Sequence, residues 1–179
     1  MSSGIVVWIT GLPSAGKSTL ATRLLEALDA RAEKACLLDG DAVRACLVPS
    51  PGYSPAERES FYETLARLAA LFAEQGLVVL VPATAHRRAF RKLARELTPA
   101  FFEVWVDTPL AECEKRDSKG LYAKRRSGEA TGVPGSDEQY EPPAAPDFTV
   151  RGAADPATIE RLLTSALARR CSAATRAQP

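Results

Sequence analysis

The feature that most constrains the fold is a short loop near the start of the chain, GLPSAGKST at residues 11–19. The apolar run IVVWIT at 5–10 precedes this loop, and a segment with leucines at helical spacing, 20–28, follows it. An uninterrupted apolar run of this length is typical of a strand buried on both faces, and the leucine spacing is typical of an amphipathic helix. The sequence therefore predicts a strand, a glycine-containing loop and a helix in direct succession.

The loop fits the phosphate-binding pattern G-x-x-x-x-G-K-S in full, and it has the strand and the helix that this pattern requires. Backbone N–H groups of such a loop and of the helix N-terminus cradle phosphate oxygens, while the lysine adds a positive charge. We therefore predict a nucleotide site in which Lys17 contacts the phosphates and Ser18 offers its hydroxyl to Mg²⁺. The predicted nucleotide-binding residues are Gly11, Leu12, Pro13, Ser14, Ala15, Gly16, Lys17, Ser18 and Thr19.

The loop alone leaves open whether the chain is a kinase, an ATPase or a GTPase. A GTPase would carry D-x-x-G after a strand and a later N/T-K-x-D for the guanine base. The stretch 117–120 matches D-x-x-G, but it follows a helix-like segment and no N/T-K-x-D comes after it. The sequence therefore argues against a GTPase.

Apolar runs alternate with helix-period segments along the whole chain. The predicted strands are 5–10, 35–39, 77–82, 101–106 and 147–150. Such alternation is typical of an α/β fold with a parallel sheet, right-handed crossovers and helices on both faces. We predict a three-layer αβα sandwich with about five strands, and ligands at the carboxyl ends of the strands.

The length of 179 residues suits one well-buried domain, which we place at 1–170, with a flexible C-terminal tail at 171–179. The segment 118–146 has no strand period but many glycines, prolines and charges, and we predict that it is a lid. Its basic side chains can stabilise a transferring phosphoryl group when the lid closes. We expect Lys119 to act in this way and Lys124 to Arg126 to be solvated.

Charge and cysteine content limit the partners. With 23 basic and 22 acidic side chains the net charge is +1, which gives no support to a nucleic-acid partner. No apolar stretch approaches the ~20 residues that span a bilayer, so we expect no membrane partner. Four scattered cysteines and one histidine argue against zinc and for a cytoplasmic location.

Two acids and an arginine follow the second predicted strand. Asp39 and Asp41 stand where that strand ends, and Arg44 lies one helical turn after Asp41. A carboxylate there can accept a hydroxyl proton or hold Mg²⁺ through water, and an arginine can bind an anionic acceptor. The alternative is a helix-capping aspartate beside a solvated arginine.

Several motifs together resemble the adenylylsulfate kinase family over residues 5–150. They are GLPSAGKST, DGDAVR, GYSPAERE, VDTPLAECEKRDSKGLYAKRRSGE and GSDEQYE, in that order along the chain. The resemblance implies a P-loop kinase that uses ATP and Mg²⁺ to phosphorylate the 3′-hydroxyl of adenosine 5′-phosphosulfate (APS), an anionic nucleotide, in sulfate assimilation. It also implies a homodimer, since members of the family are often dimers.

The resemblance assigns roles residue by residue. Asp39 takes the position of the base, and Lys17 and Lys119 the positions of the cations that act on the phosphates. Ser18 is the metal ligand, with Asp39 or Asp41 contacting Mg²⁺ through water. The implied substrate-binding residues are Asp41, Arg44, Tyr53, Arg58, Arg88, Lys119 and Val133.

The departures from the family pattern fall on the acceptor side. Phe61 replaces an asparagine, Glu63 and Thr64 replace two arginines, and Val133 replaces an aromatic residue that stacks on the acceptor base. Loss of one stacking face can weaken base binding by ~1–3 kcal/mol. Two alternatives therefore stay open: a kinase of the same family with another nucleotide-linked substrate, and a nucleotide-binding regulatory domain without turnover.

Overall fold

The computed structural model describes residues 4–98 and 100–176. Its centre is a parallel sheet of five strands in the order β2-β3-β1-β4-β5. The strands are β1 Ile5–Thr10, β2 Ala35–Leu37, β3 Val78–Pro82, β4 Phe101–Val106 and β5 Phe148–Val150. The predicted α/β class, the parallel pairing and the five strand positions are confirmed.

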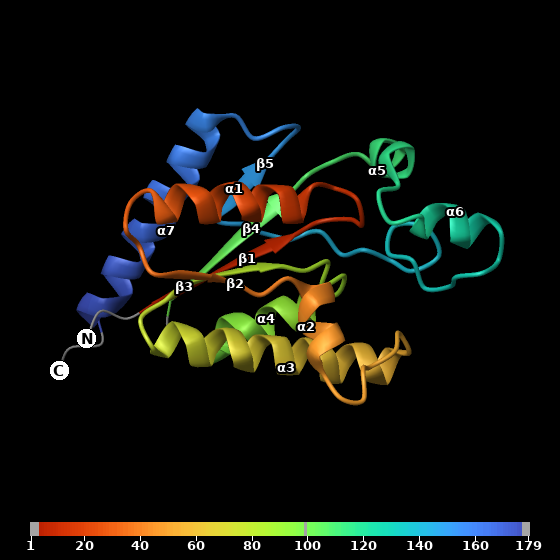
Figure 1. Ribbon diagram of the computed structural model, residues 1–179, viewed down its shortest axis with the longest axis horizontal. Coiled ribbons are helices and arrows are strands. Elements are labelled where there is room, and N and C mark those ends of the chain that lie inside the picture. The colour runs from red at the N-terminus through yellow and green to blue at the C-terminus, as the bar shows by residue number, and fades with distance from the viewer. Residues whose placement is uncertain (1–3, 99, 177–179) are drawn as a thin grey trace.

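Helices cover both faces of the sheet, and Figure 1 shows the three layers. On one face lie α1 Lys17–Asp29 and α7 Pro156–Arg176. On the other face lie α3 Pro55–Glu74 and α4 Arg88–Leu97, with α2 Gly40–Cys46 beside α3. Two short helices, α5 Leu110–Arg116 and α6 Leu121–Arg126, lie beyond the carboxyl ends of the strands.

The central strand β1 supplies side chains to both halves of the core. All six of its residues are buried, as the uninterrupted apolar run predicts. Ile5, Val7 and Ile9 pack against α1 and α7, whereas Val6 and Trp8 pack against α3 and α4. Because alternate residues of a strand point to opposite faces, one strand fixes both helical layers and the loop that follows it.

The start of α3 is fixed by a capping box, which the sequence carries as the pattern S-x-x-E at 54–57. Ser54 is the N-cap, and its side chain accepts a hydrogen bond from the backbone N–H of Glu57. The Glu57 carboxylate accepts in return from the N–H groups of Ser54 and Gly52, at 3.1 and 2.9 Å. Bonds from the Ser54 hydroxyl and these N–H groups lower the pKa of Glu57. A Cβ on Gly52 would lie 2.7 Å from this carboxylate, so a larger residue there would have to displace the Glu57 side chain.

The C-terminal helix is longer than the sequence suggested. α7 runs to Arg176, so residues 171–176, which belong to the predicted flexible tail, are helical. Residues 177–179 lie outside the described part of the chain. Arg170 of this helix donates two hydrogen bonds, of 2.8 and 2.9 Å, to the Glu33 carboxylate before β2. This pair attaches the end of α7 to the body of the domain.

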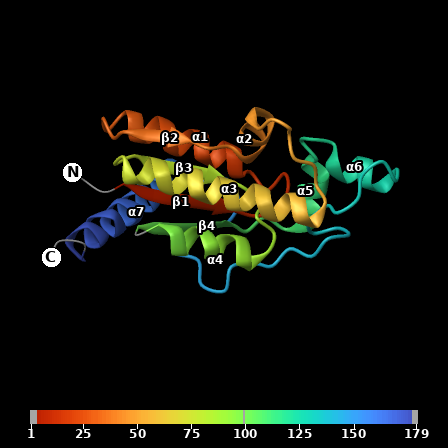
Figure 2. The ribbon, with the colours of Figure 1, turned by 90° about the horizontal axis from the view of Figure 1, so that it is seen from below.

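The predicted lid, 118–146, contains α6 and then returns along the sheet edge to β5. Figure 2 shows α6 at one end of the molecule and both termini at the other. The helices of the described part of the chain include none that is long and apolar enough to cross a membrane.

Candidate active site

A cavity of about 760 Å³ opens at the carboxyl ends of the strands, between the phosphate-binding loop, α2, the start of α3 and the lid. It is lined by residues from all four of these parts of the chain. Among the predicted site residues, the lining includes Pro13, Ser14, Gly16, Lys17, Ser18, Thr19, Asp39, Asp41, Arg44, Tyr53, Arg58, Lys119 and Val133. The fold thus brings the predicted nucleotide side and the predicted acceptor side into one cavity.

The phosphate-binding loop joins β1 to α1 as predicted. Gly16 caps α1 in a left-handed conformation, with φ of 105°. Ser14 also adopts a left-handed conformation, with φ of 60°, at a position where glycine would be unstrained. Gly11, Leu12 and Ala15 are not among the described lining residues of the cavity.

Lys17 lies inside this loop. Its Nζ donates hydrogen bonds to the carbonyl oxygens of Gly11 and Leu12, at 3.0 and 2.7 Å. Burial, followed by the positive charge of Lys119, lowers the pKa of Lys17 to about 8. An anion bound in the loop would stabilise the charged form of this lysine.

Asp39 joins the phosphate-binding loop to the acceptor side. Its Oδ2 accepts a hydrogen bond of 2.9 Å from the Ser18 hydroxyl. Its Oδ1 accepts from the N–H groups of Asp41 and Ala42, at 3.0 and 3.3 Å, and so caps α2. Asp39 is therefore a helix cap, as the alternative in the sequence analysis held, and also a residue of the cavity. One carboxylate does both because α2 begins at the rim of the cavity.

The Ser18 hydroxyl and the Asp39 carboxylate are oxygen donors, which Mg²⁺ prefers. Within residues 4–98 and 100–176, no three His, Cys, Asp or Glu side chains gather as a metal site. Mg²⁺ commonly binds to one or two protein oxygens together with substrate phosphates and water. The donors present therefore fit a Mg²⁺ ion that arrives with a nucleotide.

Asp41 and Lys119 form an ion pair across the mouth of the cavity. Asp41 lies in the first turn of α2, and Lys119 lies between α5 and α6, 78 residues further along the chain. Both side chains are more than half exposed. Lys119 of the lid thus contacts an acidic residue of the same cavity that the phosphate-binding loop lines.

Arg44 is buried, with 8% of its surface exposed, so the alternative of a solvated arginine is wrong. Its Nη1 donates to the carbonyl oxygens of Pro51 and Gly52, at 2.9 and 2.6 Å. Its guanidinium carbon lies 4.5 Å from the ring centre of Tyr53 and 3.8 Å from that of Phe61. The structure therefore holds this arginine in one orientation at the wall of the cavity.

Arg58 connects the acceptor side to the lid. Its Nε donates to the carbonyl oxygen of Tyr53 at 2.8 Å, and its Nη2 to that of Gly132 at 2.7 Å. Val133, the next residue, is buried and donates its N–H to Asp137 at 2.7 Å. These bonds hold the 132–133 stretch of the lid against the cavity.

Arg88 is the predicted substrate-binding residue that the structure places elsewhere. It is not among the described lining residues of the cavity. Its backbone N–H donates to the Glu141 carboxylate and its Nε to the carbonyl oxygen of Pro142, both at 2.7 Å. The structure therefore brings Arg88 to the returning lid and not to the described cavity lining, and its assignment to the substrate stays a prediction.

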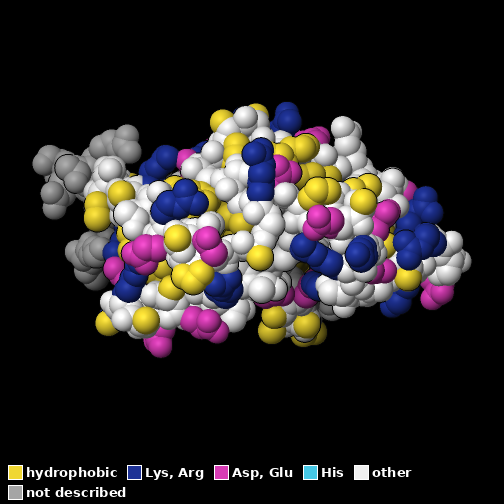
Figure 3. Space-filling view, turned by 90° about the horizontal axis from the view of Figure 1, so that it is seen from above, with side chains coloured by type: hydrophobic (Ala, Val, Ile, Leu, Met, Phe, Trp, Pro, Cys, Tyr) yellow, Lys and Arg dark blue, Asp and Glu magenta, His cyan; other side chains and the backbone are white. Residues whose placement is uncertain are grey.

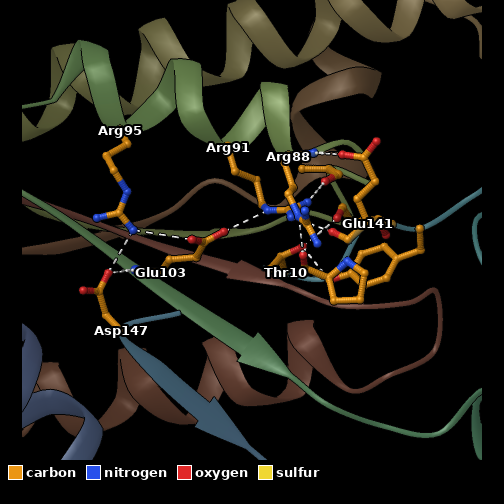
Figure 4. Close-up of polar contacts among 11 residues, drawn as sticks. Thr10, Arg88, Arg91, Arg95, Glu103, Glu141 and Asp147 are labelled. Atoms are coloured by element: carbon orange, nitrogen blue, oxygen red, sulfur yellow. Dashed lines mark hydrogen bonds and ion pairs between the residues drawn. The ribbon is translucent and has the colours of Figure 1, made fainter. Parts of the chain in front are cut away.

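A polar network that the sequence analysis missed anchors this returning segment (Figure 4). Arg91 is buried on α4 and donates to the Glu103 carboxylate at 2.8 Å and to the carbonyl oxygen of Glu141 at 2.6 Å. The Asp147 carboxylate accepts from the N–H of Glu103 at 2.8 Å and from Arg95 at 3.1 Å. Glu103 inside the apolar run 101–106 was the sequence signal for this network, because a buried carboxylate needs a basic partner.

Basic side chains gather at the end of the molecule that carries α6 (Figure 3). Arg116 and Lys119 line the cavity, whereas Lys124 and Arg126 are exposed and are not among its described lining residues. Arg125 forms an ion pair of 3.1 Å with Asp137. The prediction of solvated side chains is confirmed for Lys124 and Arg126 but is wrong for Arg125.

Comparison with known proteins agrees with this geometry. The chain is 46% identical over 151 residues to an adenylyl-sulfate kinase of Yersinia pestis, covering 83% of this chain and 71% of the relative. It is 45% identical over 147 residues to an adenylyl-sulfate kinase of Pseudomonas aeruginosa, covering 81% of this chain and 75% of the relative.

A solved structure is similar over nearly the whole fold. It is the Mycobacterium tuberculosis APS kinase in complex with AMPPNP and APS, with a TM-score of 0.86 and 37% identity, covering 92% of this chain and 98% of that one. The family profile for adenylylsulphate kinase matches residues 3–151. On these matches, the chain belongs to the adenylylsulphate kinase family.

Proposed function

We propose that this protein transfers the γ-phosphoryl group of ATP to the 3′-hydroxyl of APS, giving 3′-phosphoadenylyl sulfate and ADP. The observation that carries the proposal is the cavity in which Ser18 of the phosphate-binding loop contacts Asp39 of the acceptor side. Family membership supplies the reaction, and this contact places the two halves of the reaction within reach of one another.

The donor half holds ATP through the backbone of the phosphate-binding loop and Lys17. Lys17 exchanges its carbonyl partners for phosphate oxygens, which favour its charged form. The Ser18 hydroxyl would hold a Mg²⁺ ion that arrives with the phosphates, and this ion would supply positive charge against the charge that develops during transfer. The positive N-terminus of α1 adds to this stabilisation.

The acceptor half orients APS and receives the proton. Asp39 accepts the proton of the 3′-hydroxyl as the new O–P bond forms and the bond from the γ-phosphorus to the bridging oxygen of ADP breaks. Arg44 and Arg58 lie where they can bind the anionic groups of APS, and the exposed ring of Tyr53 offers a face to the adenine.

The lid contributes charge and excludes water. Lys119, which is paired with Asp41 in this structure, is near enough to the phosphate-binding loop to lower the pKa of Lys17. In the closed complex it stabilises the equatorial oxygens of the transferring group. Arg58 and Arg91 hold the lid at residues 132 and 141, so a closure that moves Lys119 takes place in the part of the lid before residue 132.

A coupled assay for ADP release, with and without APS, tests the proposal. We expect ADP formation to depend on APS and to saturate with it. Turnover that ignores APS but responds to another nucleotide conjugate would instead identify a changed substrate. Binding of ATP without turnover on any acceptor would identify a regulatory domain.

Three further predictions accompany this function. We propose one kinase domain at 1–170 with 118–146 as its lid, a homodimer, and a cytoplasmic location. The presence of Lys119 and Val133 of this segment in the cavity lining supports its assignment as a lid. Sedimentation-velocity centrifugation tests the dimer, and limited proteolysis with and without ATP and APS tests the lid.

A further inference from the structure

Phe61 lines the acceptor side of the cavity, although its side chain carries no charged or hydrogen-bonding group. It lies two turns into α3 and is buried, with 3% of its surface exposed. Its ring centre is 3.8 Å from the guanidinium carbon of Arg44, which is within the range of a cation–π contact. We propose that Phe61 is a positioning residue that sets the orientation of Arg44 toward the acceptor.

The bonding pattern of Arg44 shows what needs positioning. One end of the guanidinium, Nη1, is occupied by the carbonyl oxygens of Pro51 and Gly52. Within the described part of the chain, Nε and Nη2 have no hydrogen-bond partner. Neither is among the fully buried side-chain atoms that lack a partner. These two groups form an edge of the guanidinium that can donate to an anion in the cavity that Arg44 lines.

The stack fixes the plane of this edge. Hydrogen bonds through Nη1 alone leave a guanidinium free to tilt, whereas a ring against its flat face holds the plane. Phe61 provides the closer ring, at 3.8 Å against 4.5 Å for Tyr53, and its burial keeps it still. Tyr53 is 62% exposed, so its ring can turn toward a ligand without releasing Arg44. Phe61 is therefore the ring that stays in place against the Arg44 guanidinium.

This inference rests on the proposed function, because APS is the anion that we expect Arg44 to bind. Phe61→Met removes the aromatic face but keeps apolar bulk, and Phe61→Tyr restores the face. Phe90→Met is the matched control, because Phe90 is a buried ring of the same core cluster that stacks on Tyr62, with no contact to Arg44 among those described. Arg44→Lys, alone and combined with Phe61→Met, tests whether Phe61 acts through Arg44.

We expect Phe61→Met to raise the KM for APS about tenfold, the scale of a desolvated cation–π contact, with the KM for ATP and kcat within twofold of wild type. Phe61→Tyr and Phe90→Met should leave the KM for APS within about twofold. In the Arg44→Lys background, Phe61→Met should add less than about twofold. Equal effects of Phe61→Met and Phe90→Met, or full additivity with Arg44→Lys, would overturn the proposal.

A second variant keeps the test independent of folding. Replacing Phe61 by 3,4,5-trifluorophenylalanine preserves the ring but removes the negative potential of its face, so the KM for APS should rise about threefold or more. An unchanged KM in this variant would also overturn the proposal. Wild-type protein without APS-dependent turnover would contradict the proposed function itself, whereas normal wild-type turnover with unchanged Phe61 variants contradicts this inference alone.

Discussion

The hydroxyl of Ser18 donates a hydrogen bond of 2.9 Å to the carboxylate of Asp39. Ser18 stands in the first turn of α1, and Asp39 is the N-cap of α2, so the bond links the starts of two helices that follow β1 and β2, the strands on either side of β3. In a phosphoryl transfer, the donor and the acceptor must meet in line within a few ångströms. In the proposed function, this contact marks the place where they meet.

Asp39 is predicted to be essential for turnover independently of its role as a helix cap. Asparagine caps a helix about as well as aspartate, so Asp39→Asn should keep the melting temperature close to that of wild type. It cannot accept a proton, and kcat should fall by about 10²–10⁴ with the KM for ATP nearly unchanged. Steady-state kinetics and thermal unfolding of the same preparation measure both. A parallel loss of kcat and stability would make Asp39 structural.

Lys119 is predicted to act in the chemical step from the lid. Lys119→Met should lower kcat by about 10²–10³, since a cation aimed at developing charge is lost. Lys124→Met, an exposed lysine of α6 outside the described cavity lining, should leave kcat within about twofold and serves as the matched control. Single-turnover rates with saturating ATP and APS measure the effect. Similar losses in both variants would point to general electrostatic attraction.

Val133 is predicted to limit the affinity for the acceptor. It lines the cavity at the position where the family resemblance expects a stacking aromatic side chain. Val133→Phe should lower the KM for APS by up to about tenfold if the ring stacks on the adenine, with Val133→Leu as the aliphatic control. Because Val133 is buried, overpacking can cost ~1–3 kcal/mol of unfolding free energy, which thermal unfolding measures. An unchanged or higher KM in a folded variant would contradict APS as the acceptor.

The Glu33–Arg170 pair is predicted to make stability depend on pH. Hydrogen bonds from Arg170 lower the pKa of Glu33 below its ordinary 4.5, so the native state binds fewer protons than the unfolded chain. The stabilisation is therefore complete above pH 4.5 and is lost as the pH falls through the native pKa. Arg170→Met should cost ~0.5–1 kcal/mol at pH 7 and little at pH 3.

Urea unfolding across this pH range measures the difference. Lys124→Met is the control, because Lys124 is exposed and no ion pair is described for it. A cost for Arg170→Met that is the same at both pH values would show that the loss comes from packing of α7 and not from charge.

The sequence predicts the local parts of the site well because each depends on neighbouring residues. The phosphate-binding loop, the capping box at Ser54 and the aspartate after β2 are short patterns whose geometry follows from backbone chemistry. The sheet class follows from the alternation of apolar runs with helical periods. These parts need no knowledge of how distant segments pack.

The parts that the sequence analysis missed are contacts between distant segments. Arg58 reaches Gly132 across 74 positions, and Arg91 reaches the carbonyl of Glu141 across 50. Arg88 and Arg91 are both basic residues at the start of α4, and the sequence pattern does not distinguish them. The path of the lid decides that Arg91 is buried and that Arg88 bonds to the lid at the surface. Tertiary placement, not local pattern, decides these cases.

The central claim is that the terminal phosphoryl group of ATP moves to the 3′-oxygen of APS in the cavity between the phosphate-binding loop and Asp39. Incubation of wild-type protein with γ-labelled ATP, Mg²⁺ and APS, followed by ³¹P NMR of the purified nucleotide, tests it most directly. The account predicts one labelled product with a phosphate ester on the 3′-oxygen, formed in equal amount to ADP and absent with Asp39→Asn. Label found only in inorganic phosphate, or ADP formed at the same rate without APS, would contradict it.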